Sequence, residues 1–148
     1  MQSTVSEILR EKGNWVLTIR PDATVFDAIS EMEKKRVGAV VILDEDDRML
    51  GIFTERDYLR RIVLRGRTSK TTRIDEVMTS NVICVQPSFT VGECMATMTD
   101  KKLRHLPVVE DGRLTGIISI GDCVKKISRE AQAQVRFLTD YVTGKYPA

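Results

Sequence analysis

The chain has 148 residues, enough for one compact domain or for two small halves that share a core. Its hydrophobic content of 42% and charged content of 30% are ordinary for a soluble globular protein, and no run approaches the roughly eighteen apolar residues of a membrane span. The net charge of +2 is too small to indicate nucleic-acid binding. The start of the chain lacks the pattern of a secretion signal, so we expect a cytoplasmic protein.

The first third of the chain alternates between helical and extended patterns. Ser3 or Thr4 can cap a first helix and Gly13 can end it. Thr24 can cap a second helix, whose apolar residues recur at the i, i+3, i+4, i+7 spacing of a buried face. The predicted elements are, in order, a helix over residues 3–12, a strand over 16–19, a helix beginning at 25, a buried strand over 39–43 and a strand over 49–53.

A strand-to-helix junction follows this last strand. Gly51 and a short apolar run indicate the strand, and the apolar residues beyond Thr54 recur at helical spacing. Thr54 and Asp57 therefore lie where the first N–H groups of a helix lack intrahelical partners and where the helix dipole favours negative charge. The same pattern returns later, with Ser119 and Asp122 in the corresponding places. We call these pairs the first and the second junction.

The chain contains the same unit twice, with an offset of 66 residues. Under this offset Pro21 corresponds to Pro87, and the helical stripe after Thr24 corresponds to an apolar stripe after Thr90. A repeat that occurs only twice indicates pseudo-two-fold symmetry. We therefore predict an α+β fold of two β-α-β-β-α units, each with a small three-stranded sheet, packed sheet to sheet. The pseudo-dyad would create two equivalent clefts between the units.

The repeat also predicts the boundaries along the chain. The first unit would span residues 1–66, a linker 67–73, the second unit 74–128, and a C-terminal helix and tail 129–148. The tail carries a narrow apolar seam that could pack on its own domain or form a homodimer contact, and Gly144 would end its helix. The seam consists of Ala131, Val135, Leu138 and Val142.

Metal and nucleic-acid sites have little support in the sequence. The three cysteines form no C-x-x-C pair and the chain has one histidine, so no metal site of recognisable spacing can be assembled. Six basic residues and no acidic one lie between Arg60 and Arg73, which indicates an exposed linker or a contact for an anion or an acidic partner. No aromatic residue interleaves this run, so bases would lack a stacking platform.

The duplication, the order of elements and the two Gly-apolar-apolar-Thr/Ser-x-x-Asp junctions resemble a pair of CBS (cystathionine β-synthase) domains, the Bateman module. The resemblance covers residues 5 to 128 and is most specific at 51–57 and 104–109, with a typical lead-in at 75–79. It implies a module that binds adenine nucleotides or other adenosyl compounds in the clefts and reports on cell energy state. It also implies flat homodimers of four CBS units.

The resemblance further implies which residues bind the ligand. The junction aspartates would accept hydrogen bonds from ribose hydroxyls, and Thr54 and Ser119 would donate to a phosphate near helix N-terminal N–H groups. Arg56 would neutralise a phosphate, whereas its counterpart Gly121 carries no charge. We expect Arg104 and His105 to contact the phosphates of a nucleotide held at the second junction, which leaves the first cleft dependent on Arg56.

Apolar residues before the middle strand and on the first strand of each unit would sandwich the purine. The complete predicted set is Leu17, Val37, Gly38, Ala39, Thr54, Arg56, Asp57, Met78, Thr79, Ile83, Leu103, Arg104, His105, Ser119, Gly121 and Asp122. Other interpretations of these residues stay open. The junction pairs are close to capping boxes and could simply close helix ends, and His105 could be an ordinary core histidine.

The leading functional interpretation is a stand-alone regulatory module that binds AMP, ADP, ATP or NAD, requires no obligatory cofactor and acts on a partner protein. The sequence has no nucleophile–base pair and no P-loop lysine, so we do not expect an enzyme. One alternative is a structural dimerisation module without a ligand. The other is a binder of nucleic acid or of an acidic partner through the basic linker.

Overall fold

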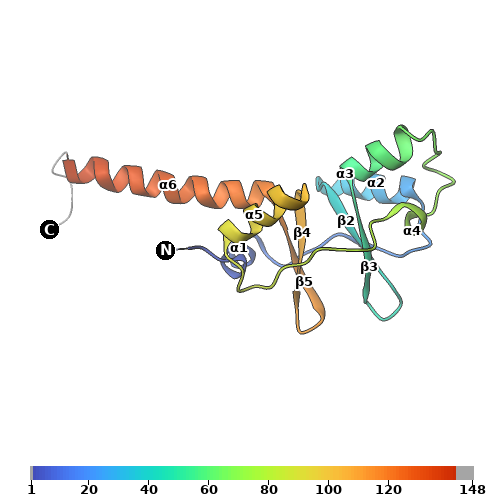
Figure 1. Ribbon diagram of the computed structural model, residues 1–148, viewed down its shortest axis with the longest axis horizontal. Coiled ribbons are helices and arrows are strands. Elements are labelled where there is room, and N and C mark those ends of the chain that lie inside the picture. Colours follow the sequence, from blue (N-terminus) through green and yellow to red (C-terminus); the bar gives the residue numbers. More distant parts are fainter. Residues whose placement is uncertain (1, 143–148) are drawn as a thin grey trace.

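Two units, each built around a small sheet, lie side by side, and a long helix projects from the second unit (Figure 1). The structure is a computed structural model that describes residues 2–142, with side chains described for residues 2–136. The predicted helix end at Gly144 lies outside the described residues. No helix within residues 2–142 is both long and apolar enough to cross a membrane.

The first unit has the predicted three-stranded sheet, in the order β1-β2-β3, with β1 parallel and β3 antiparallel to β2. Helix α2 begins with a capping box in which Thr24 and Asp27 exchange hydrogen bonds. The bounds are Thr18–Ile19 for β1, Val25–Lys35 for α2, Ala39–Leu43 for β2, Met49–Thr54 for β3, Glu55–Tyr58 for α3 and Leu59–Val63 for η1, a π-helical continuation of α3.

The second unit repeats this order with one difference. Its helix α5 begins with the equivalent capping box, formed by Thr90 and Glu93. Its strands form a two-stranded antiparallel sheet, whereas the sequence predicted three strands. The bounds are Val91–Lys101 for α5, His105–Glu110 for β4, Arg113–Ser119 for β5 and Ile120–Val142 for α6.

The missing strand has a local cause. In the first unit, the N–H of Val41 donates to the carbonyl of Leu17 at 2.9 Å and so extends the parallel ladder. The repeat places Pro107 at the position of Val41, and proline has no N–H to donate. The parallel pairing of the second unit is therefore reduced to one isolated bridge, between Val85 and Val108.

The two lead-in helices pack crosswise. Helix α1 (Val5–Lys12) precedes the first unit, but its buried residues belong to the core of the second. Helix α4 (Ile74–Val77) precedes the second unit, but its buried residues belong to the core of the first. The prediction counted α1 with the first unit, within residues 1–66, whereas its buried residues pack in the core of the second. Two isolated bridges, Thr4 with Thr90 and Thr24 with Arg73, fix this exchange.

Strand β2 joins the two units through its alternate faces. Val40 and Ile42 lie in the core of the first unit, whereas Ala39 and Val41 belong to a separate apolar cluster between the sheets. Side chains of a strand alternate between its faces, so one strand supplies both the core of the first unit and the cluster between the sheets. Leu114 of β5 packs against the cluster from the second unit. The predicted sheet-to-sheet packing of an α+β tandem is confirmed.

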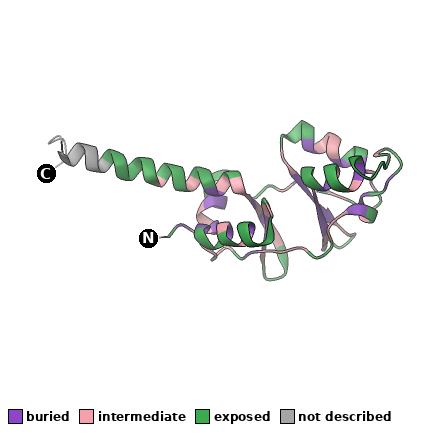
Figure 2. Cartoon of the chain, turned by 45° about the horizontal axis from the view of Figure 1, so that its top comes forward, coloured by how far each residue is buried: buried purple, intermediate pink, exposed green. Residues whose placement is uncertain are grey.

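Helix α6 continues far beyond the second unit (Figure 2). Residues 131–136 are all exposed, and the Val135 side chain is 63% exposed. The interpretation that the apolar seam packs back on its own domain is therefore wrong for Ala131 and Val135. The side chains of Leu138 and Val142 lie outside the described residues.

Two glycines give opposite expectations for the same substitution. A methyl group at Gly51 would lie 2.7 Å from Met78 Sδ and 2.7 Å from the Thr79 carbonyl oxygen, whereas at Gly92, in α5, the nearest atom is 3.9 Å away. We expect Gly51→Ala to lower the free energy of unfolding by about 1–3 kcal/mol through overpacking. Gly92→Ala should raise it by up to about 1 kcal/mol because alanine favours the helix. Urea denaturation measures both, and equal effects would contradict this packing.

Candidate functional site

Both junctions are capping boxes. At the first, the N–H of Thr54 donates to Asp57 Oδ2 at 2.9 Å and the N–H of Asp57 donates to Thr54 Oγ1 at 3.3 Å. At the second, the N–H of Ser119 donates to Asp122 Oδ2 at 2.8 Å and the N–H of Asp122 donates to Ser119 Oγ at 3.1 Å. The interpretation that these pairs close helix ends is confirmed. At the first junction, the same pair also lines a cavity.

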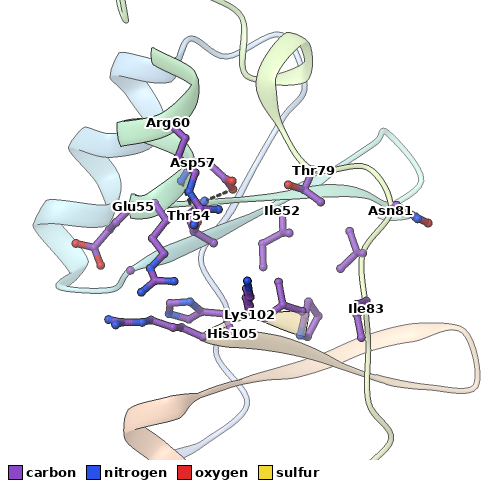
Figure 3. Close-up of a pocket in the computed structure, with 16 residues that line it drawn as sticks. Ile52, Thr54, Glu55, Asp57, Arg60, Thr79, Asn81, Ile83, Lys102 and His105 are labelled. Carbon is purple, nitrogen blue, oxygen red and sulfur yellow. Dashed lines mark hydrogen bonds between the residues drawn. The ribbon is translucent and has the colours of Figure 1, made fainter. Parts of the chain in front are cut away.

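This cavity, which we call the first cleft, has a volume of about 250 Å³ and is formed by both units. Thr54, Asp57 and Arg60 line it from the first unit, and Ile83, Lys102 and His105 line it from the opposite side (Figure 3). The predicted residues that line it are Gly38, Thr54, Arg56, Asp57, Thr79, Ile83, Leu103, Arg104 and His105. The sequence reasoning missed Ile52, Glu55, Arg60, Asn81, Val82, Lys102 and Pro107.

Three of the seven missed residues are direct neighbours of predicted ones. Glu55 adjoins Thr54, Lys102 adjoins Leu103, and Val82 adjoins Ile83, so widening each predicted segment by one residue finds them. Arg60 lies four residues after Arg56 and therefore on the same helical face. The four-residue spacing from Arg56 is therefore a signal by which Arg60 could have been predicted from the sequence.

Other predicted residues lie elsewhere. Leu17 is buried in the core of the first unit, and Ala39 lies in the cluster between the sheets. Val37 lines a separate hollow beside α2 and α3. Met78 packs against Gly51. Ser119, Gly121 and Asp122 remain together at the second junction, at the start of α6.

The predicted pairing of residues with junctions is wrong in one respect. Arg104 and His105 line the first cleft together with Thr54 and Asp57. The first cleft takes its junction from the first unit, and its opposite wall, with Arg104 and His105, comes from the second. Gly38 lies between the side chains of Glu55 and His105. A methyl group at Gly38 would contact the Glu55 side chain and lie 3.2 Å from His105 Cε1.

The first cleft carries an excess of positive charge. Four cationic side chains and two carboxylates line it, and within residues 2–136 none of the four cations forms an ion pair. The cations are Arg56, Arg60, Lys102 and Arg104, and the carboxylates are Glu55 and Asp57. An unpaired excess of this kind in a partly enclosed site favours an anionic ligand.

His105 contributes a neutral imidazole to this site. Burial lowers its pKa below the usual range, and the charges of Lys12 and Arg104 act in the same direction, although Glu55 and Asp122 oppose them. The imidazole is therefore uncharged at neutral pH and can accept or donate a hydrogen bond inside the cleft.

The second junction is engaged by a lysine. Lys12 Nζ, at the end of α1, lies 2.8 Å from Asp122 Oδ2 and also donates to the carbonyl oxygen of Ile117 at 2.9 Å. Burial would raise the pKa of Asp122, but the hydrogen bonds from Lys12 and Ser119 outweigh it and hold this pKa below its usual range. The carboxylate is therefore ionised and already paired.

The basic run between Arg60 and Arg73 is largely occupied within the chain. Arg61 donates to the carbonyl of Val77 at 2.6 Å, and Arg67 pairs with Glu76 at 2.9 Å. Lys70 lies 5.0 Å from the centre of the Phe26 ring, and Arg73 pairs with Asp75. These contacts engage four of the six basic residues within the chain, and Arg60 lines the first cleft.

Metal ligands do not cluster in the described part of the chain. No group of three or more His, Cys, Asp or Glu side chains within it could hold a metal ion. Cys94 and Cys123 are buried in the core of the second unit. Burial raises the pKa of Cys94 to about 12 and that of Cys123 to about 11, so both thiols stay protonated at neutral pH.

Comparison with known proteins decides the family. The family model described as CBS domain matches twice, at residues 16–64 and 74–129. The chain belongs to the CBS-domain family. Its curated relatives include the mitochondrial CBS domain-containing protein CBSX3 of Arabidopsis thaliana, which is 38% identical over 153 residues that cover 97% of this chain and 74% of the relative.

Solved structures of CBS proteins share the fold. The CBS-domain containing protein from Agrobacterium tumefaciens is 42% identical, with a TM-score of 0.80 over 84% of this chain and 93% of that one. A CBS domain protein from Pyrobaculum aerophilum, complexed with AMP, is 28% identical, with a TM-score of 0.72 over 80% of this chain and 88% of that one.

The lowered pKa of His105 predicts a pH dependence of stability. Its folded-state pKa lies below the unfolded value of about 6.5, so the free energy of unfolding should fall as the pH drops from about 6.5 through the folded-state pKa. His105→Gln should remove this part of the dependence, because His105 is the chain's one histidine. Urea denaturation at pH 7.5 and 5.5 compares the two proteins, and identical pH dependence would contradict the burial of this imidazole.

Proposed function

We propose that this CBS pair is a regulatory module that binds an adenine nucleotide in the first cleft and passes the binding on to a partner protein. The observation that carries the proposal is the composition of the cleft. Apolar side chains, a junction carboxylate and four cations that form no ion pair within residues 2–136 line one cavity between the two units. The AMP complex of the Pyrobaculum relative, which has the same fold, supports this ligand class.

Each part of the nucleotide has a matching wall in the proposed site. Ile52, Ile83 and Leu103 offer apolar contact to the purine. Asp57, whose Oδ2 already accepts the Thr54 N–H, keeps Oδ1 as an acceptor for a ribose hydroxyl. The phosphate would lie among the cations from the two units, where guanidinium groups bind phosphate oxygens in two-pronged contacts.

Regulation follows from the position of the cleft. A ligand that contacts both units binds one relative arrangement of them better than another, and it shifts the population by that difference in affinity. We extend the proposal to a homodimer, because helical residues of both units leave apolar side chains exposed. These residues are Leu59, Val63, Val124, Ile127 and Val135. Energy sensing in the cytoplasm and the choice among AMP, ADP, ATP and NAD belong to the same proposal.

A thermal-shift panel tests the ligand class. AMP, ADP, ATP and NAD at millimolar concentration should raise the melting temperature, since a ligand at a hundredfold excess over its Kd adds about 2.7 kcal/mol to the free energy of unfolding. Adenosine should stabilise the protein less, because it has no phosphate for the four cations. A panel in which no adenosyl compound changes the melting temperature would reject the proposal.

Two capping aspartates separate ligand binding from helix capping. Asp57→Asn should lower the affinity for AMP at least tenfold, because the ribose contact loses its charged acceptor. Asp27→Asn is the matched control, since Asp27 Oδ2 accepts the Thr24 N–H at 3.1 Å in the same kind of capping box but lies on α2, outside the cleft lining. Isothermal titration calorimetry measures both. Equal losses in the two variants would assign Asp57 to capping alone.

A further inference from the structure

The two junctions are related by the repeat, but the lead-in helices that reach them differ in length. Helix α1 has eight residues and α4 has four. The two helices share one sequence pattern, because residues 5–9 (Val-Ser-Glu-Ile-Leu) match residues 74–78 (Ile-Asp-Glu-Val-Met). This match makes Leu9 the counterpart of Met78, and the contacts of the two residues agree with it. A methyl group at Gly116 would lie 2.7 Å from Leu9 Cδ2, and one at the equivalent Gly51 would lie 2.7 Å from Met78 Sδ.

Beyond these equivalent residues the two segments diverge. After Met78 the backbone is extended, and Thr79 pairs with Ile52 and lines the first cleft. After Leu9 the helix continues for almost one more turn and ends at Lys12, before Gly13. Only α1 therefore carries a side chain on to its junction, and that side chain is a lysine.

The extra turn places an ammonium group on the second-junction carboxylate. Lys12 Nζ lies 2.8 Å from Asp122 Oδ2, and the Lys12 and Asp122 side chains are only 32% and 22% exposed. Neighbouring contacts hold the helix in place, because Glu11 accepts a hydrogen bond from Lys126 of α6 at 2.6 Å. The pair is thus partly shielded from water and anchored at both ends, unlike a freely exposed ion pair.

Among the described side chains, no cation at the first junction is equivalent to Lys12. The nearest ionic partner of Asp57 is Arg61, whose Nε lies 4.0 Å from Oδ1, and this guanidinium donates to the Val77 carbonyl at 2.6 Å. Asp57 therefore faces the first cleft without a lysine on it, whereas Asp122 is paired by a residue of its own chain.

We infer that Lys12 takes the place of a ligand at the second junction, so that each chain binds one nucleotide, in the first cleft. The inference rests on the proposed function and adds the number of nucleotides that each chain binds. Asp122 Oδ2 accepts both the Lys12 ammonium and the Ser119 N–H, whereas Asp57 Oδ2 accepts only the Thr54 N–H. The ammonium on Asp122 would therefore compete with ribose hydroxyls for this carboxylate.

Calorimetric titration of the full chain with AMP tests the inference. The wild type should bind one AMP per chain, and Asp57→Asn should weaken that binding at least tenfold. Lys12→Met, which keeps the length of the side chain and removes its charge, should bind two AMP per chain. Adding Asp122→Asn to Lys12→Met should return the number to one. Lys126→Met is the matched control, because it breaks another lysine contact between α1 and α6 and should stay at one.

Each other result has a definite meaning. Two AMP per wild-type chain would overturn the inference and leave the proposed function standing. One AMP per chain in a folded Lys12→Met protein would also overturn it, and Lys12→Gln provides a second variant if the methionine protein does not fold. AMP binding to neither the wild type nor the variants, with the proteins folded, would overturn the proposed function and this inference together.

Discussion

The crossed packing of the two lead-in helices holds the rest of the structure in place. Helix α1 completes the core of the second unit, and α4 completes that of the first, so neither unit can bury its apolar residues without the other's lead-in. The exchange also places Leu9 of α1 against Gly116, before the second junction, and Met78, at the end of α4, against Gly51, before the first junction. The geometry of both candidate ligand sites therefore depends on the same contacts that stabilise the pair.

A capping box by itself does not make a binding site. The structure has this motif at the start of α2, α3 and α5, and an equivalent pair of hydrogen bonds at the start of α6. Its local role is the same each time, because the side chains satisfy N–H groups that have no partner in the first turn. Among the four, within residues 2–136, Thr54 and Asp57 are the pair for which the opposite unit supplies an apolar wall and cations without an ion pair across a cavity.

Small differences between the two copies give the clefts different chemistry. Pro107 removes one backbone N–H and reduces the second sheet to two strands. Gly121 stands where the first unit has Arg56, so the second junction lacks that charge. The longer α1 brings Lys12 onto Asp122. An approximate symmetry of the backbone thus supports one open cleft and one junction that is internally paired.

The sequence by itself determined the elements, the duplication and the two junctions, because helical spacing, capping residues and glycine positions are local properties of the chain. It also identified many residues of the first cleft, through the family resemblance. Only the tertiary structure decided which residues meet. The crossed arrangement places Arg104 and His105 opposite Asp57, and Lys12 on Asp122, across separations of up to 110 residues that no local pattern encodes.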